Sequence, residues 1–416
     1  MSRWPSGAAA LVAAALLGLL ALAQPALGAS QDQRSAAAER GPQVGARAWI
    51  VADARNGTVL ASHAAAERLP IASTTKLMTA YVTLRELPLD EIVRVAPYEA
   101  ELGESLLEVP SGERISVRDL LYGLIMRSGN DAAHTLAIAV SGSTKRFVRE
   151  MNRYAAALGL ADTHYSNPIG LDQRGNYSSA RDLATLSRRL LRNPAFAKIA
   201  ASRIALLRSL RPPRRITTIN ELLYMAPWAT GVKTGHTLDA RYVLVGSGER
   251  KGVELVSVAL GSPTDEGRYV ANLELLEYGF SQYARRVPVR DGQRVAWPEI
   301  RYSGGRLPLE AARRVSVGLR RGQRLGRKVR APAEVEGPIR RGAVLGSVTV
   351  YVDGMEVAKV PLRASRAIPA ASDFDRARAF VDDNTLPIAV GAFVILMAGV
   401  LLYRLSRRME RGRGNG

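Results

Sequence analysis

The period of the hydrophobic positions changes along the chain, and each change marks a predicted element. Short apolar runs rich in β-branched residues predict strands over residues 48–53, 58–61, 231–233, 242–246 and 254–260. Asn56-Gly57 supplies a hairpin turn between the first two. From Thr74 to about Ile204 the apolar positions recur at helical spacing, and a closing helix follows from about Arg268 to Ala284. Strands on both sides of a helical middle predict one α/β domain, residues 46–285, with helices on the faces of its sheet.

A different pattern follows this α/β domain. Short alternating runs are separated by Gly and Pro residues: Val348, Val350 and Val352 alternate, and Asp353-Gly354 provides a two-residue turn to a partner strand. This pattern predicts a small all-β domain over residues 286–366. It contains no set of residues that suggests catalysis.

The N-terminal segment has the three parts of an export signal. Arg3 precedes an apolar run over residues 7–23, and small residues follow over residues 25–30. We therefore predict a signal peptide over residues 1–29; an uncleaved N-terminal anchor is the alternative. The polar, alanine-rich residues 30–45 predict a disordered lead-in.

A second apolar segment lies near the C-terminus. Residues 386–403 carry no charge, and as a helix they would span about 27 Å, close to the thickness of a bilayer core. Arginines follow at Arg404, Arg407, Arg408, Arg411 and Arg413. The pattern predicts a linker over residues 367–385, a transmembrane helix over 386–403 and a basic cytoplasmic tail over 404–416. By the positive-inside rule the catalytic domain would then lie on the extracytoplasmic side of the cell membrane; a buried core helix is the alternative.

Composition narrows the possible chemistry. The chain has no cysteine, which excludes disulfides, thiol catalysis and sulfur-ligated metals. The histidines His63, His134, His164 and His236 form no metalloprotease motif, so neither metal nor cofactor is predicted. A formal charge of +20 would suit binding to anionic lipids, wall polymers or nucleic acid, but we favour the simpler interpretation of an arginine-rich composition with a solvated basic surface. No motif or aromatic-interleaved basic patch indicates nucleic-acid binding.

Three short motifs carry the candidate chemistry. Only seven of the 58 basic residues are lysines, and two of these seven occur in Ser73-Thr74-Thr75-Lys76 and in Lys233-Thr234-Gly235. Ser128-Gly129-Asn130 lies between them. Each motif alone is a weak signal, whereas all three in this order are typical of serine acyl-transfer enzymes.

The spacing within the first motif suggests how the serine is activated. A serine hydroxyl is a poor nucleophile unless a base lies beside it. Lys76 is one helical turn after Ser73, so its amine can reach the hydroxyl. Burial and a second cation such as Lys233 would lower the pKa of this amine and favour its neutral form. Without the other motifs, an N-cap serine followed by an exposed lysine would be the preferred interpretation of the pattern.

These motifs, with further segments, resemble the low-molecular-mass penicillin-binding proteins of the serine-type D-alanyl-D-alanine carboxypeptidase family. The resemblance extends from about Ala46 to Ala367. The additional matching segments are Leu77-Met78-Thr79-Ala80, Asp131-Ala132, Gly170-Leu171-Asp172, Tyr177-Ser178-Ser179-Ala180-Arg181-Asp182 and Gly231-Val232 with His236-Thr237. Arg241 departs from the pattern, because such enzymes often have glycine there; this affects the shape of the local loop rather than the chemistry.

The resemblance implies a fold and a set of roles. The fold is a two-part catalytic domain like that of β-lactamases and transpeptidases, followed by the β-rich domain. The implied catalytic residues are Ser73 as nucleophile, Lys76 as base and Ser128 as proton relay. The implied substrate-binding residues are Asn130, Lys233, Thr234, Gly235, His236 and Arg268. Backbone N–H groups of Ser73 and His236 would form the oxyanion hole.

The implied function is removal of the terminal D-alanine from peptidoglycan pentapeptide stems through an acyl-enzyme on Ser73, with a role in cell-wall biosynthesis and cell shape. β-Lactam antibiotics would acylate the same serine. A D,D-endopeptidase or β-lactamase on the same fold is an alternative, although Asn167-Pro168-Ile169-Gly170-Leu171-Asp172 lacks the glutamate pattern of efficient lactamases. A non-catalytic protein that senses penicillin or binds the wall is another.

Overall fold

The computed structural model of the protein describes residues 42–412, with side chains up to residue 405. The signal peptide expected over residues 1–29 lies outside the described residues, as does most of the lead-in expected over residues 30–45. The chain divides into two compact units. The first runs to Gly248 and includes Glu254–Gln282; the second consists of Glu249–Val253 and the chain from Tyr283 onward.

A five-stranded sheet with the order β2-β1-β9-β8-β7 organises the first unit. Its strands are β1 (Ala48–Asp53), β2 (Val59–His63), β7 (Ala229–Thr237), β8 (Arg241–Arg250) and β9 (Val253–Ser262). Strand β1 pairs antiparallel with β9, so both ends of the domain meet in one sheet, as the pattern predicts. Strand β7 is an edge strand, and one side of it is open to another chain.

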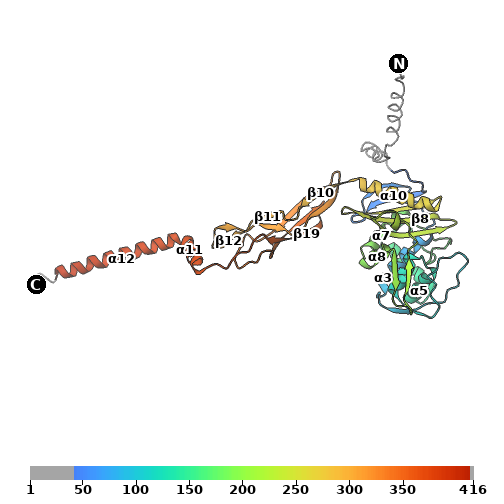
Figure 1. Ribbon diagram of the computed structural model, residues 1–416, viewed down its shortest axis with the longest axis horizontal. Helices are drawn as coiled ribbons and strands as arrows, with labels where there is room; N and C mark the ends of the chain where they lie inside the picture. Colours follow the sequence, from blue (N-terminus) through green and yellow to red (C-terminus); the bar gives the residue numbers. More distant parts are fainter. Residues whose placement is uncertain (1–41, 413–416) are drawn as a thin grey trace, which may run out of the picture. The chain divides into compact units, whose positions relative to one another are not determined.

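Helices cover both faces of this sheet. They are η1 (Ala72–Thr75), α3 (Lys76–Glu86), α4 (Val117–Met126), α5 (Asn130–Ser141), α6 (Thr144–Ala157), α7 (Ala180–Leu191), α8 (Pro194–Ala200), α9 (Leu222–Met225) and α10 (Asp265–Ser281). Helix α10 lies on one face, and α7 and α8 lie on the other (Figure 1). Two short hairpins complete the unit: β3 (Ile92–Arg94) with β4 (Arg114–Ser116), and β5 (Ile204–Leu207) with β6 (Arg214–Thr217).

Helix α4 is the central element of the helical part. Its N-cap Ser116 accepts a hydrogen bond from the Asp119 N–H, and Leu120, Leu121 and Leu124 are almost completely buried. Because α4 is apolar on so much of its surface, it packs against α3, α5 and α8 at once. Such a packed helix provides a rigid support for the turn that follows it.

The second unit is a small all-β domain. Its strands are β10 (Tyr283–Val289), β11 (Arg294–Ala296), β12 (Glu299–Ile300), β13 (Gly305–Arg306), β14 (Leu309–Ala311), β15 (Val315–Arg320), β16 (Leu325–Arg330), β17 (Glu334–Val335), β18 (Val344–Val352) and β19 (Met355–Ala364). The largest sheet has the order β11-β14-β19-β18-β16. Val348 and Val350 on β18 and Val360 and Leu362 on β19 are fully buried, which is the inward half of the alternation seen in the sequence.

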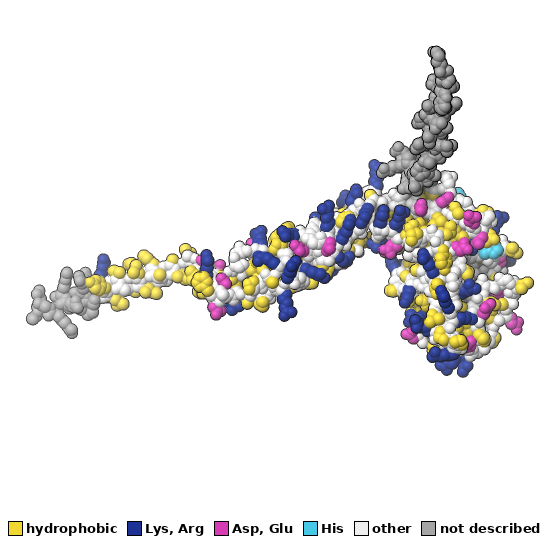
Figure 2. Space-filling model, in the orientation of Figure 1, with side chains coloured by type: hydrophobic (Ala, Val, Ile, Leu, Met, Phe, Trp, Pro, Cys, Tyr) yellow, Lys and Arg dark blue, Asp and Glu magenta, His cyan; other side chains and the backbone are white. Residues whose placement is uncertain are grey.

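The basic residues are unevenly distributed between the units. Residues 286–366 hold 18 of the 58 basic and seven of the 38 acidic side chains, which gives this segment +11 of the formal charge of +20. Lysine and arginine side chains are accordingly frequent on the surface formed by β10 to β19 (Figure 2).

Two helices follow the β domain. Within the segment predicted as a linker, α11 (Asp373–Asp383) begins at a capping box formed by Ser372 and Asp375. Helix α12 (Thr385–Gly412) includes residues 385–405, which are long and apolar enough to cross a membrane. No part of this segment is buried against the rest of the described chain, so the structure does not support the alternative of a core helix.

Candidate active site

Ser73 and Lys76 lie on one turn where η1 passes into α3. The Lys76 Nζ donates hydrogen bonds to Ser73 Oγ at 2.9 Å and to the carbonyl oxygen of Ile169 at 2.5 Å. Ala72, immediately before the serine, has a φ of +45°, a conformation that non-glycine residues rarely adopt outside functional sites. Ser73 is partly exposed while Lys76 is fully buried, so the hydroxyl is accessible and its partner is shielded from water.

Burial is the main influence on the Lys76 amine. It lowers the pKa of Lys76 to about 7, although the negative charges of Glu104 and Asp131 oppose the shift. Near neutral pH a large fraction of the amine is therefore unprotonated and able to accept a proton. Lys76 and Lys233 are also electrostatically coupled, so the positive charge of either amine disfavours the protonated form of the other.

Ser128 and Lys233 form a second serine–lysine pair. Ser128 occupies the turn between α4 and α5 with a φ of +61°, and Lys233 Nζ donates to its hydroxyl at 2.9 Å. Lys233 also donates to the Thr234 carbonyl oxygen at 2.7 Å. It is fully buried, and burial together with the positive charges of Lys76 and Arg268 holds its pKa well below the usual value.

Gly235 allows β7 to approach the nucleophile. A Cβ atom at this position would lie 3.0 Å from the backbone nitrogen of Ser73 and 2.7 Å from Val243 Cγ2. The edge strand that carries Lys233 and Thr234 therefore runs directly beside the turn that carries Ser73. The three sequence motifs meet at one place, although they come from η1, the α4–α5 turn and β7.

Asn130 is the first residue of α5, and its carboxamide contacts a residue that sequence analysis missed. Asn130 Nδ2 donates to Glu104 Oε2 at 2.6 Å, and the Tyr98 hydroxyl donates to the same oxygen. Glu104 and Tyr98 lie in the connection between β3 and β4, which has no regular structure. No motif marks them, because an isolated acid in a polar loop is not distinguishable from a solvated one by pattern.

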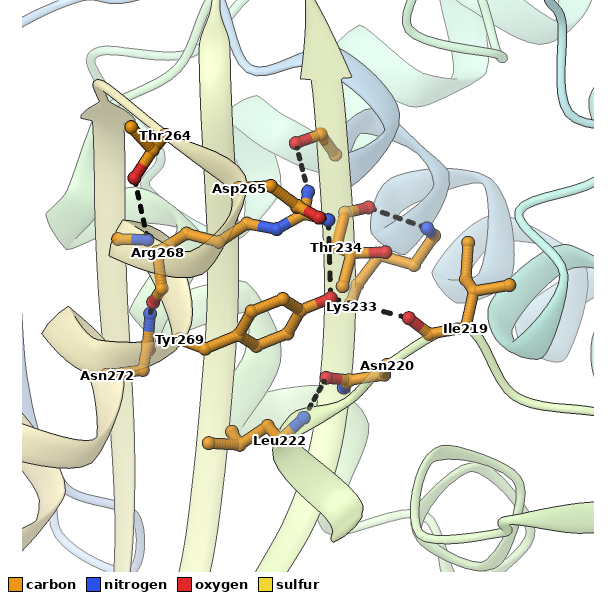
Figure 3. Close-up of polar contacts among 12 residues, drawn as sticks. Ile219, Asn220, Leu222, Lys233, Thr234, Thr264, Asp265, Arg268, Tyr269 and Asn272 are labelled. Carbon is orange, nitrogen blue, oxygen red and sulfur yellow. Dashed lines mark hydrogen bonds and ion pairs between the residues drawn. The ribbon is translucent and has the colours of Figure 1, made fainter. Parts of the chain in front are cut away.

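Arg268 projects from α10 toward β7. Figure 3 shows its guanidinium beside the strand near Thr234, with Asp265 next to it as an ion-pair partner. Its Nη1 donates to the Gly235 carbonyl oxygen at 2.9 Å, and its Nη2 donates to the Tyr269 hydroxyl at 3.2 Å. With only 9% of its surface exposed, Arg268 is much less solvated than most arginines of the chain.

His236 and Arg241 flank the end of β7. His236 is exposed and stacks on Tyr242, with 4.2 Å between ring centroids. Arg241 has a φ of +53°, so it adopts the left-handed conformation that a glycine would adopt there. The loop shape is therefore compatible with arginine, at a strain of about 1 kcal/mol. Arg241 also lines a hollow of about 320 Å³ that no residue of the three motifs lines.

The segment from Asn167 to Asp172 closes the site on the other side. Gly170 has a φ of +93°, and a Cβ atom there would lie 2.1 Å from the Ala72 carbonyl oxygen. Asp172 accepts hydrogen bonds from the Thr237 hydroxyl at 2.6 Å and from the Asp239 N–H at 3.1 Å. Its carboxylate thus joins this segment to the end of β7.

Gly170→Ala is expected to destabilise the catalytic domain by about 2–4 kcal/mol, because the new methyl group must displace the backbone beside Ser73. Thermal unfolding of the full chain measures the change. Gly159→Ala is the matched control, since Gly159 also has a positive φ, +71°, but faces open space. Equal losses of stability in the two variants would contradict the steric explanation.

Among the described residues no group of three or more His, Asp or Glu side chains is arranged to hold a metal ion. A partly exposed serine hydroxyl beside a buried amine, next to an open strand edge, defines an active-site serine enzyme that transfers acyl groups.

Comparison with known proteins identifies the family. Residues 33–264 match the family model of D-alanyl-D-alanine carboxypeptidases, and residues 283–370 match that of the C-terminal domain of penicillin-binding protein 5. The chain therefore belongs to the D-alanyl-D-alanine carboxypeptidase family of low-molecular-mass penicillin-binding proteins, and its activity is that of a serine-type carboxypeptidase.

Individual relatives agree over most of the chain. It is 33% identical to the D-alanyl-D-alanine carboxypeptidase DacC of Escherichia coli over 357 residues, which is 82% of this chain and 88% of the relative. Among solved structures it is similar to penicillin binding protein 5 from Haemophilus influenzae (TM-score 0.54, 28% identity, 79% of this chain and 98% of the other). It is also similar to D-alanyl-D-alanine carboxypeptidase from Mycobacterium tuberculosis (TM-score 0.54, 38% identity, 58% and 92%).

Proposed function

We propose that Ser73 is the nucleophile that attacks the penultimate D-alanine carbonyl of a peptidoglycan stem peptide. The observation that carries this proposal is the 2.9 Å contact between Ser73 Oγ and the buried Lys76 amine. The neutral amine takes the hydroxyl proton as the C–O bond forms. The tetrahedral intermediate places its negative oxygen at the backbone N–H groups of Ser73 and His236, which act as the oxyanion hole.

Departure of the terminal D-alanine needs a proton on its nitrogen. Ser128 is suited to deliver it, because its hydroxyl is held by Lys233 and lies on the turn beside the nucleophile. The C–N bond then breaks, and the terminal D-alanine leaves as the acyl-enzyme forms on Ser73. Attack by water on this ester releases the shortened stem and restores the hydroxyl.

The substrate is expected to bind as an additional strand along the open edge of β7. Asn130 would hydrogen-bond its amide, and Gly235 lets its backbone come close. Thr234, Lys233 and Arg268 would hold its terminal carboxylate. These side chains are buried near this edge, so their hydrogen bonds would replace the water that the carboxylate loses when it binds.

A comparison of substrates tests the role of Arg268. The wild-type protein should prefer a tripeptide ending in a free carboxylate to the same peptide ending in an amide. Arg268→Gln should reduce this preference in kcat/KM by about tenfold, whereas Arg149→Gln on the exposed face of α6 should not change it. An unchanged preference in the folded Arg268 variant would exclude it from carboxylate binding.

Three substrates distinguish carboxypeptidase from endopeptidase and β-lactamase. We expect release of D-alanine from diacetyl-Lys-D-Ala-D-Ala to exceed both cleavage of a cross-linked stem dimer and turnover of a β-lactam. The reason for slow lactam turnover is that Asp172, the acid of the segment from Asn167 to Asp172, is occupied by Thr237 and the Asp239 N–H, so it is not free to activate water. Lactam turnover faster than D-alanine release would contradict the proposal.

We place the catalytic domain outside the cytoplasmic membrane, anchored by α12. Residues 385–405 can cross a bilayer, and the arginines from Arg404 onward favour a cytoplasmic tail. Because the chain has no native cysteine, one cysteine at Ala201 and another at Gly412 can be labelled separately in intact cells with an impermeant maleimide. Only the first should react; labelling of the second alone would reverse the orientation.

The N-terminal signal peptide and the role in cell-wall biosynthesis and cell shape belong to the same proposal. A mature protein that begins near Ala29 would support export with cleavage, and a mature protein that begins at residue 1 would indicate an uncleaved anchor. A purely penicillin-sensing or wall-binding protein is excluded if replacing Ser73 removes D-alanine release without changing noncovalent binding to isolated walls.

A further inference from the structure

Glu104 is a loop carboxylate whose side chain is hydrogen-bonded to the side chain of a motif residue, Asn130. Its Oε2 atom accepts hydrogen bonds from Asn130 Nδ2, at 2.6 Å, and from the Tyr98 hydroxyl. Its Oε1 atom accepts from the Glu101 N–H at 3.1 Å. Both carboxylate oxygens are therefore engaged. Burial acts to raise the pKa of Glu104, but these bonds and the nearby Lys76 outweigh it and hold the pKa below its usual value, so the group is ionised at neutral pH.

The loop that carries Glu104 is attached to the start of α5. The Asn130 N–H donates to the Ser105 carbonyl oxygen at 2.8 Å, and Asp131 accepts from the N–H groups of Leu107 and Glu108, each at 2.8 Å. Gly129 permits this approach, since a Cβ atom there would lie 3.0 Å from the Leu107 nitrogen. Glu104 is thus held in place by the backbone as well as by its own hydrogen bonds.

The hydrogen bonds of Glu104 restrict the Asn130 carboxamide to one orientation. With one Nδ2 proton directed to Glu104, the remaining donor and the carbonyl oxygen have fixed directions. Without the carboxylate, the carboxamide can rotate about its last side-chain bond, and a substrate must then order it on binding. An amide that is oriented beforehand binds more tightly and more selectively.

Glu104 also influences the amine that activates the nucleophile. The charged groups that face Lys76 are Glu104 from the loop, Asp131 from α5 and Lys233 from β7. Asp131 accepts hydrogen bonds from backbone N–H groups of the loop, whereas Glu104 accepts them from the side chains of Asn130 and Tyr98. Its negative charge favours the protonated form of Lys76 and so offsets part of the effect of burial.

We propose that Glu104 is a positioning residue of the acylation step, which orients the Asn130 carboxamide toward the substrate and places a negative charge within electrostatic range of the Lys76 amine. The inference rests on the proposed roles of Ser73 and Lys76. Tyr98 acts through Glu104, because its hydroxyl donates to the same carboxylate oxygen as Asn130. Glu104 itself need not touch the substrate.

The test is the rate of acylation by benzylpenicillin, followed by intact mass between pH 5.5 and pH 9 with the full chain in detergent. Glu104→Gln removes the charge but keeps an oxygen that can accept from Asn130. Lys76 then loses its proton at lower pH, so the ratio of the rate at pH 6 to that at pH 8 should rise at least about twofold. Glu104→Asp, which keeps the charge, should return the ratio toward the wild-type value.

Glu104→Ala removes both functions and should reduce the rate at pH 8 by about tenfold, because the Asn130 carboxamide is no longer oriented. Glu101→Gln is the matched control: this exposed acid lies in the same loop and contributes only its backbone N–H, so its ratio and its rate should match the wild type.

Two outcomes would overturn the inference. One is a Glu104→Gln profile that coincides with the wild type or moves to higher pH. The other is a folded Glu104→Ala variant that acylates as fast as the wild type at pH 8. A wild-type protein that forms no adduct on Ser73 at any pH would instead refute the proposed function, so the two failures are distinguishable. Thermal unfolding of each variant identifies any that does not fold. If one does not, the rate and pH profile of Glu104→Asp are compared with those of the wild type instead.

Discussion

Ser73→Ala is expected to abolish release of D-alanine from diacetyl-Lys-D-Ala-D-Ala, with a loss on the order of 10⁴-fold or more. The described site has no second accessible nucleophile, because Ser128 is buried, and the chain has no cysteine. The measurement is D-alanine released per minute by the full chain. Substitution of a partly exposed side chain by alanine leaves the fold intact, so thermal unfolding should be almost unchanged.

Ser303→Ala, on an exposed serine of the β domain, provides the control and should retain full activity. A Ser73→Ala protein that still releases D-alanine at more than about one per cent of the wild-type rate would contradict the assignment of the nucleophile.

Lys76→Arg is expected to reduce acylation of Ser73 by about 10³-fold. Arginine preserves the positive charge and much of the length, but it cannot lose its proton and therefore cannot act as the base. Lys198→Arg, on an exposed lysine of α8, is the matched control and should be silent. A Lys76→Arg variant with nearly normal acylation would show that the base is elsewhere.

The same amine determines the pH profile. Since burial lowers the pKa of Lys76 to about 7, the neutral form predominates above that pH and is lost below it. The wild-type rate of acylation should therefore rise with pH through about 7 and reach a plateau, and the residual rate of Lys76→Arg should lack this rise. A wild-type rate that falls as pH increases through 7 would contradict a neutral lysine base.

Local pattern was sufficient to predict the elements that carry the chemistry. The strand expected over residues 48–53 is β1, and the Asp353-Gly354 turn joins β18 to β19. Pattern was less accurate at boundaries, because the closing helix begins at Asp265, after the N-cap Thr264, rather than at Arg268. The start of this helix is set by its polar N-cap residue, Thr264, and a search for hydrophobic periodicity does not detect a polar cap.

The catalytic pairs were predictable for a similar reason. Ser73 and Lys76 are one turn apart, so local helix geometry brings them together. The contact of Lys233 with Ser128 joins residues 105 positions apart and was not predicted, since the family resemblance assigned both residues to the site without pairing them. Glu104 was not predictable in either way, since its role depends on a loop held against α5 by Asp131.

Arg241 is a position where the residue type differs from the one that the backbone conformation favours. The left-handed φ at this position favours glycine, and in this chain arginine adopts it. Glycine is therefore favoured here by about 1 kcal/mol of backbone strain and is not an absolute requirement. By contrast a Cβ atom at Gly170 would lie 2.1 Å from a backbone oxygen, so there the missing side chain is essential. A Cβ atom at Gly235 would lie 2.7 Å from Val243 Cγ2 and 3.0 Å from the Ser73 nitrogen, so a side chain there would require its neighbours to move.

The most direct test of the account is peptide mapping of the full chain after brief exposure to benzylpenicillin at pH 8. We predict one equivalent of antibiotic per protein, attached to the peptide that contains Ser73 and absent from the Lys76→Arg protein at the same exposure. A folded wild-type protein with no adduct, or with its adduct on Ser128 or another residue, would contradict the claim that the Ser73 hydroxyl is activated by the buried Lys76 amine.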